Sequence, residues 1–128
     1  MSTTADAGRG IAGCRPTAGT PVSIDASAIE STAEHALQRF KHELDDEGLV
    51  PAEVVVRADF GADCSISTQS EADRVRDVIY AADYLGAGTV RLEIEGVADR
   101  SKVRPAVSAL RERAQREGLT LAVETDDL

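Results

Sequence analysis

The sequence predicts an α+β fold, a two-layer sandwich with three helices on one face of a mostly antiparallel five-stranded sheet. The apolar patterns along the chain follow the order β-α-β-β-α-β-α-β. The first six of these elements match the ferredoxin-like split βαβ pattern, here extended by one helix and one strand. The strands alternate apolar and polar residues, whereas a sheet covered on both faces shows near-continuous apolar runs. We therefore expect the second face of the sheet to be open to solvent or to a partner.

Composition divides the chain into three segments. Residues 1–20 are rich in Gly, Ala, Thr and Ser and are predicted to form a disordered N-terminal tail. Residues 21–125 contain the periodic apolar patterns and are predicted to form a single α+β domain, because 128 residues suffice for one core but not for two. Residues 126–128 form an acidic C-terminal end.

The first half of the domain is predicted to begin with a short strand over 21–25. A helix follows from Ser27, where Glu30 completes a capping box, and ends at Gly48. Residues 53–60 form the next strand, with Val54, Val56, Ala58 and Phe60 on its inner face.

A hairpin is predicted next, since residues 61–63 form a turn and residues 64–68 alternate as a returning strand. The second helix is expected to begin at Ser70 and to end at the glycines of 86–88. A strand over 89–96, a helix over 101–117 and a strand over 119–124 complete the fold.

The charge of the chain excludes several classes of partner. A net charge of −9 disfavours binding to nucleic acid and to anionic membrane surfaces, which both need a positive field. No apolar run approaches the roughly 20 residues of a membrane span, and the N-terminus lacks the apolar core of a secretory signal. Cys14 and Cys64 have no CxxC spacing and are typical of free thiols in a reducing compartment. We therefore expect a cytoplasmic protein.

The charged residues also suggest an ionic environment. The chain contains many acids, much Ala and 12 Arg against 2 Lys. This composition resembles that of proteins from salt-in halophiles, whose acidic surfaces suit a cytoplasm rich in KCl. An acidic protein from a GC-rich actinobacterium would have a similar composition, so both origins stay open. At 1 M salt the Debye length falls to about 3 Å, which would screen repulsion among the surface acids.

Both histidines lie in the first predicted helix, with four acids close behind them. His35 and His42 fall opposite the apolar stripe, and two helical turns, about 10.5 Å, separate them along the axis. One metal ion cannot bridge that gap with ligand bonds near 2 Å. We expect a solvated helix face, with a weak site of His42 and Asp45 or Asp46 as the alternative. No metal or cofactor is predicted.

No catalytic residue is predicted either. Cys64 as a nucleophile would need a neighbouring base, and neither histidine lies on a face that reaches it. The glycines of 86–88 follow a helix, whereas a phosphate-binding loop precedes one. In a chain with 23 acidic residues, a pair of carboxylates is weak evidence for acid/base chemistry. The sequence leaves enzymatic activity undecided and favours its absence.

The third predicted helix is a basic island, because six of the fourteen basic residues lie within 100–116 beside the single acid Glu112. In one interpretation their stems cover the apolar stripe and their charges pair with acids of neighbouring elements. In the other they bind an acidic partner, such as the first helix of a second copy, because arginine binds carboxylates bidentately. The residues of this docking surface would be Arg104, Arg111, Arg113 and Arg116.

The function predicted from these features is a non-catalytic protein-binding or regulatory module, whose partner is another protein or a second copy in a homodimer. The alternative is a small-molecule role, either an anion-sensing domain or an enzyme whose site forms between subunits. Arg57 and Arg91 lie on the open face and would hold an anion if the strand order brings them together. RNA binding is not expected, because the outward positions lack aromatic residues on which bases stack.

Overall fold

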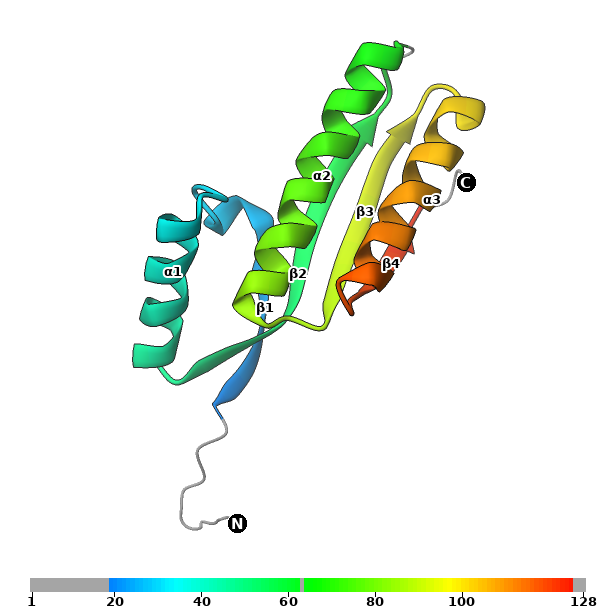
Figure 1. The fold of residues 1–128 in the computed structure, drawn as a ribbon. Helices are drawn as coiled ribbons and strands as arrows, with labels where there is room; N and C mark the ends of the chain where they lie inside the picture. The colour runs from blue at the N-terminus through cyan, green and yellow to red at the C-terminus, as the bar shows by residue number, and fades with distance from the viewer. Residues whose placement is uncertain (1–18, 63, 126–128) are drawn as a thin grey trace.

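The computed structural model describes residues 19–62 and 64–125, in which strands alternate with α-helices and a short 3₁₀ helix precedes the first α-helix (Figure 1). The strands are β1 (Thr20–Asp25), β2 (Leu49–Phe60), β3 (Thr89–Val97) and β4 (Thr120–Glu124). The helices are the short 3₁₀ helix η2 (Ala26–Ala28), α1 (Glu34–Asp46), α2 (Ser65–Leu85) and α3 (Arg100–Arg116). Residues 1–18 of the predicted tail lie outside the described residues, and so does the whole of the acidic end 126–128.

The described part of the chain forms one sheet of four parallel strands in the order β1-β2-β3-β4. This arrangement overturns the prediction of a mostly antiparallel five-stranded sandwich of the ferredoxin-like type. A parallel pair of strands needs a crossover connection, which is usually a helix. Here α1, α2 and α3 each supply one crossover between consecutive strands (Figure 1).

The prediction fails at residues 64–68, which do not form a returning strand. Cys64 is the N-cap of α2, which begins at Ser65, five residues before the start predicted at Ser70. The alternation of this segment suits a strand, but five residues fit a helical turn equally well, with Thr68 buried and Ile66 80% exposed. Without a strand at 64–68, the predicted hairpin is replaced by a βαβ crossover through α2, and β2 and β3 are parallel.

The first helix also begins later than the capping box predicts. Asp25 Oδ1 accepts a hydrogen bond from the Ser27 amide at 2.9 Å, which stabilises η2 in place of the predicted helix start. The helix α1 begins at Glu34. Its end is confirmed, because Gly48 follows it with a φ of +70°, a conformation that favours glycine.

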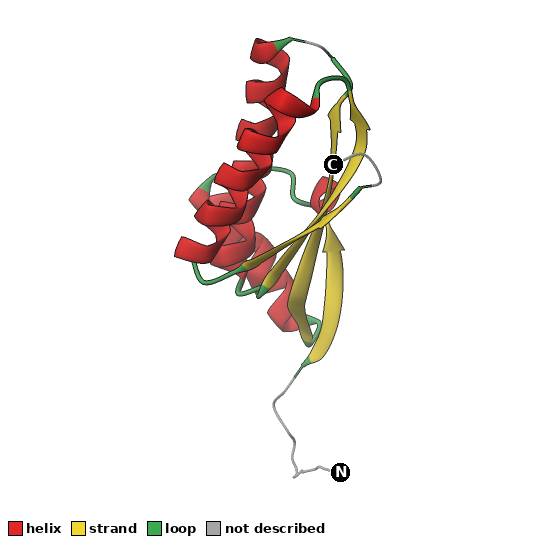
Figure 2. Cartoon of the chain, turned by 90° about the vertical axis from the view of Figure 1, so that its right-hand side faces the viewer, coloured by secondary structure: helices red, strands yellow, loops and turns green. Residues whose placement is uncertain are grey.

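The three α-helices lie on one face of the sheet and leave the other face uncovered (Figure 2). The core lies between the two layers, and the inner positions of β2 (Val54, Val56, Ala58 and Phe60) are buried as predicted. The helices contribute Ala72, Val75, Val78, Ile79, Ala82, Val103, Val107, Leu110 and Ala114 to this core. Within 19–62 and 64–125, no helix has the length and apolar character needed to cross a membrane.

Candidate functional site

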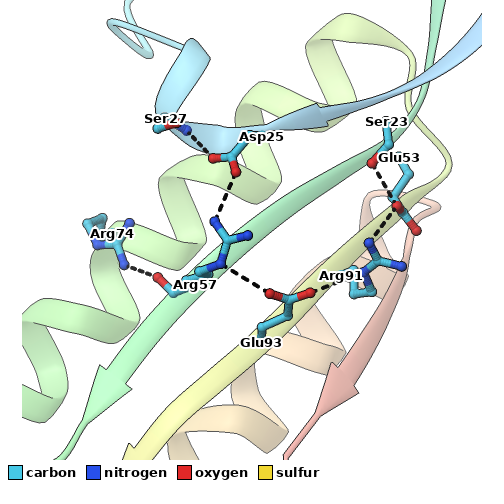
Figure 3. Close-up of polar contacts among 8 residues, drawn as sticks. All are labelled: Ser23, Asp25, Ser27, Glu53, Arg57, Arg74, Arg91 and Glu93. Carbon is cyan, nitrogen blue, oxygen red and sulfur yellow. Dashed lines mark hydrogen bonds and ion pairs between the residues drawn. The ribbon is translucent and has the colours of Figure 1, made fainter.

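The uncovered face of the sheet carries a ladder of alternating charges from three neighbouring strands (Figure 3). Arg57 of β2 lies near its centre. Its Nη1 donates a hydrogen bond to Asp25 Oδ2 of β1 at 2.9 Å, and its Nε lies 3.3 Å from Glu93 Oε1 of β3. The register explains the second contact, because Arg57 and Glu93 are direct partners across the two strands. The Arg57 side chain therefore joins three strands.

Arg91 of β3 continues the ladder in the other direction. Its Nη2 lies 3.4 Å from Glu53 Oε1, and its Nε lies 3.6 Å from Glu93 Oε2. Glu53 also accepts a hydrogen bond from the Ser23 hydroxyl at 2.8 Å. The Arg91 Nε is buried and has no hydrogen-bond partner among the described residues, because its contact with Glu93 is longer than a hydrogen bond. The complete ladder is Asp25, Arg57, Glu93, Arg91 and Glu53.

The structure thus brings together the two arginines predicted to hold an anion. Arg57 and Arg91 contact opposite oxygens of Glu93, so the anion between them is a carboxylate of the chain itself. The hydrogen bond to Asp25 raises the pKa of Arg57, and the nearby Glu93 raises it further. An added anion would have to displace Glu93 from both guanidinium groups.

Asp25 is held firmly in its charged form at the end of the ladder. The backbone N–H of Ser27 lowers its pKa most, followed by the Ser27 hydroxyl and by Arg57, and the resulting pKa is about 2. Asp25 is therefore ionised at neutral pH and remains available to Arg57.

A second ion pair joins α2 to the strand that carries Arg57. Arg74 Nε donates to Glu71 Oε1 at 2.9 Å. Arg74 Nη2 donates to the backbone oxygen of Arg57 (Figure 3). Glu71 Oε2 accepts the backbone N–H of Asp59 at 2.8 Å, next to a shift of register between Ala58 and Asp59. The hydrogen bond from Arg74 lowers the pKa of Glu71. The i,i+3 spacing of Glu71 and Arg74 predicts that these two side chains contact each other. It does not predict their hydrogen bonds to β2.

The four arginines predicted to form one docking surface lie on two flanks of α3. Arg104 and Arg111 line a hollow of about 310 Å³ next to β4. Arg113 and Arg116 line a groove of about 220 Å³ between α2 and α3. On a helical wheel with about 100° per residue, the buried apolar stripe of α3 lies between Arg104 and Arg111 on one side and Arg113 and Arg116 on the other. The basic island of the sequence is therefore two surfaces.

Within residues 19–62 and 64–125, these arginines form no ion pair with acids of neighbouring elements. Arg113 Nε lies 4.0 Å from Glu117 Oε1, one turn along the chain. Within the part of the chain that the structure describes, no ion pair involves Arg104, Arg111 or Arg116. In a chain with a net charge of −9, such guanidinium groups are available to an acidic partner.

The histidines form no ligand cluster. His35 and His42 are exposed on α1, as predicted, and His42 Nε2 lies 3.8 Å from Asp46 Oδ2. Among residues 19–62 and 64–125, no group of three or more His, Cys, Asp or Glu side chains is placed to hold a metal ion.

Cys64 is exposed at the start of α2, whereas the sequence predicted that it lies in a strand. The backbone amides of Ser67 and Ile66 lower the pKa of its thiol. This is the ordinary effect of a helix N-terminus on a cysteine.

Each edge strand of the sheet pairs with one neighbour among the described residues, β1 with β2 and β4 with β3. The Thr120 amide donates to the Gly88 oxygen on the β3 side. Because amides alternate in direction along a parallel strand, those of Leu121 and Val123 point to the outer edge. The hollow beside Arg104 and Arg111 adjoins this edge and includes Val123.

Comparison with known proteins gives a family and a fold. A family model described as Domain of unknown function (DUF8564) matches residues 18–123. No curated protein matches the sequence. The fold is similar to that of a xylose isomerase domain protein from Planctomyces limnophilus, with a TM-score of 0.61 and 16% identity. The match covers 82% of this chain and 44% of that protein, so this chain spans less than half of its length. This likeness shows a parallel fold of alternating β and α units.

Proposed function

This chain belongs to the family described as Domain of unknown function (DUF8564), and we propose that it is a cytoplasmic protein-binding module without catalytic activity of its own. One observation carries the proposal. Arg104 and Arg111 line a hollow beside the outer edge of β4 and make no ion pair within the described residues, in a chain with 23 acidic side chains. Such a surface suits an acidic polypeptide.

The chemistry of this surface suggests how a partner binds. The outward amides of β4 offer hydrogen bonds to an added strand, which is a common mode of peptide recognition. The two guanidinium groups beside the strand would bind carboxylates of the same partner through charge-assisted hydrogen bonds. Backbone pairing would supply affinity, and the arginines would select an acidic sequence.

The alternative of an anion-sensing domain has less support. Arg57 and Arg91, the residues that would bind the anion, already contact Glu93. Displacing that carboxylate would leave its charge unpaired on the sheet face, where the Glu93 side chain is 31% exposed.

The proposal is tested by affinity capture from lysate at the native salt concentration, with quantitative mass spectrometry. The bait variant Arg104→Glu/Arg111→Glu reverses the charge beside β4. The matched control Arg113→Glu/Arg116→Glu makes the same change in charge on the other flank of the same helix. We expect a partner that the wild type and the control recover and that the first variant loses at least tenfold. A wild type that recovers neither another protein nor a second copy of itself would overturn the proposal.

A further inference from the structure

The face of this parallel sheet that the described residues leave bare is itself informative. Parallel sheets occur almost only where both faces are covered, yet the helices here cover a single face (Figure 2). Three side chains of the bare face are partly buried, because Glu53, Arg91 and Glu93 are only 27%, 35% and 31% exposed, whereas Asp25 and Arg57 are 46% and 53% exposed. Their charges are matched to one another along the ladder, which is the condition under which ionic groups tolerate further burial.

The strand order limits what can cover this face. Sequential parallel strands with all helices on one side are the arrangement inside a β/α barrel, where the helices form an outer ring around eight strands. A doubly wound sheet instead reverses its strand order and carries helices on both faces. The described part of the chain supplies four strands in sequential order and leaves both outer edges unpaired. Four strands are half of such a barrel.

We propose that a second copy of this chain covers the open face, so that two chains close one eight-stranded barrel. The inference rests on the proposed function and names the chain itself as the acidic partner. β4 of one copy pairs in parallel with β1 of the other, and the two-fold axis generates an identical second seam. The charge ladder then lies in the interior of the barrel, which in eight strands is just wide enough for side chains to fill.

Charge at the seam favours this occupant. Arg104 and Arg111 flank β4, whereas β1 leads into α1, where Glu34, Glu43, Asp45 and Asp46 outnumber Arg39 and Lys41. Pairing β4 with the partner's β1 therefore brings the basic flank of α3 towards the acidic end of the other copy. The Thr20 amide donates to Gly48 on the β2 side, so the nitrogen of Pro21 faces the outer edge of β1, where it has no N–H to donate.

Charge inside the barrel sets a condition on the dimer. The Asp25–Arg57 and Glu53–Arg91 ion pairs each have a net charge of zero, so their burial inside the barrel adds no net charge there. Glu93, in the middle of β3, and Glu124, at the carboxyl end of β4, are direct partners, and closing the barrel would bring both copies of these acids into one interior. Salt screens the resulting repulsion, so the dimer should strengthen as KCl rises.

The test is the mass of the purified full chain, measured by light scattering after gel filtration at several protein concentrations. KCl is raised from about 0.1 M to about 1 M, which shortens the Debye length from roughly 10 Å to roughly 3 Å. We expect twice the single-chain mass of 13.5 kDa at high salt. Val123→Pro removes an outward amide of β4 and should weaken self-association at least tenfold, while the matched variant Val123→Ala keeps the amide and the dimer.

Two outcomes would overturn the barrel. One is a wild type of single-chain mass at every salt and protein concentration; a heterologous partner captured from lysate would then still support the proposed function. The other is a Val123→Pro variant that keeps its fold and remains dimeric. If Val123→Pro loses its cooperative melting transition, Arg104→Glu/Arg111→Glu takes its place, because it alters only exposed side chains. That variant should become monomeric, whereas Arg113→Glu/Arg116→Glu should stay dimeric.

Discussion

Arg57 and Asp25 join the edge strand β1 to the centre of the sheet through a hydrogen-bonded ion pair of 2.9 Å. The second oxygen of Asp25 accepts the Ser27 amide, also at 2.9 Å. One carboxylate therefore attaches β1 to β2 and stabilises the turn that follows β1. Both contacts favour the ionised form of Asp25, which explains the low pKa of this group.

The stability of the protein should depend on pH through Asp25. Its pKa falls from 3.8 to about 2 on folding, so its contribution is complete above about pH 4 and is lost as pH falls towards 2. We expect Asp25→Asn to lower the melting temperature at neutral pH, and the difference from wild type to shrink between pH 4 and pH 2. Circular dichroism melts over this pH range measure it. The control Asp83→Asn removes an exposed acid of α2 and should show no such convergence. A difference that stays constant down to pH 2 would contradict this role.

The packing of helix α1 against the rest of the protein should be sensitive to a single truncation. Its buried side chains are Leu37 and Leu44, and Leu37 is fully buried. Leu37→Ala removes this attachment and should cost about 2–5 kcal/mol of unfolding free energy, measured by urea denaturation. Ile66→Ala is the control, because Ile66 is 80% exposed, and its effect should stay within about 0.5 kcal/mol. Equal effects of the two substitutions would show that α1 is not held in this way.

Gly86 ends α2 in a left-handed conformation, with a φ of +87° and no atom within 4 Å of the place that an added Cβ would occupy. Gly86→Ala should therefore destabilise the protein by about 1 kcal/mol through backbone strain alone. Gly88 also has open space around it but not a φ in this region. Gly88→Ala should be neutral or stabilise by up to about 1 kcal/mol. Urea denaturation of both variants measures whether their changes in unfolding free energy have opposite signs. An equal loss of stability in both variants would contradict this prediction.

Long periodic segments of the sequence predicted their elements well. The helix expected over 101–117 is α3, and the strand expected over 89–96 is β3. Each has several repeats of its apolar spacing, which identifies its period. The segment 64–68 has too few residues to distinguish a strand from a helical turn, and this one segment decided the direction of the whole sheet. The polar alternation in β2 and β3 also favoured an antiparallel sheet, because parallel sheets are rarely left open.

The candidate site was predictable in part. The contact of Arg57 and Arg91 with one carboxylate depends on the register of β2 against β3, which no local pattern gives. The division of the α3 arginines was within reach of the sequence, because a helical wheel places Arg104 and Arg111 opposite Arg113 and Arg116. These arginines were predicted to form one surface because they lie close together in the sequence. The missing ion pairs of α3 needed coordinates, since they depend on the acids of neighbouring elements.

Salt should act on stability most clearly where β3 meets β4. Glu93 and Glu124 are direct partners across these strands, where like charges are destabilising and one favourable pair contributes roughly 0.2–1 kcal/mol. Glu124→Gln should therefore stabilise the protein by that amount at low salt. The gain should vanish near 1 M KCl, where the Debye length is about 3 Å, and the wild type itself should become more stable, as its acidic composition predicts.

This prediction is measured by denaturation in urea, which leaves the ionic strength under control, at a protein concentration low enough to keep the chain in one association state. Glu112→Gln is the matched control, because it removes the same charge from the basic helix α3. That variant should gain nothing at low salt, since Glu112 is the single acid among the six basic residues of 100–116. A Glu124→Gln gain that is equal at both salt concentrations would mean that side-chain packing, and not repulsion from Glu93, limits the stability of β4.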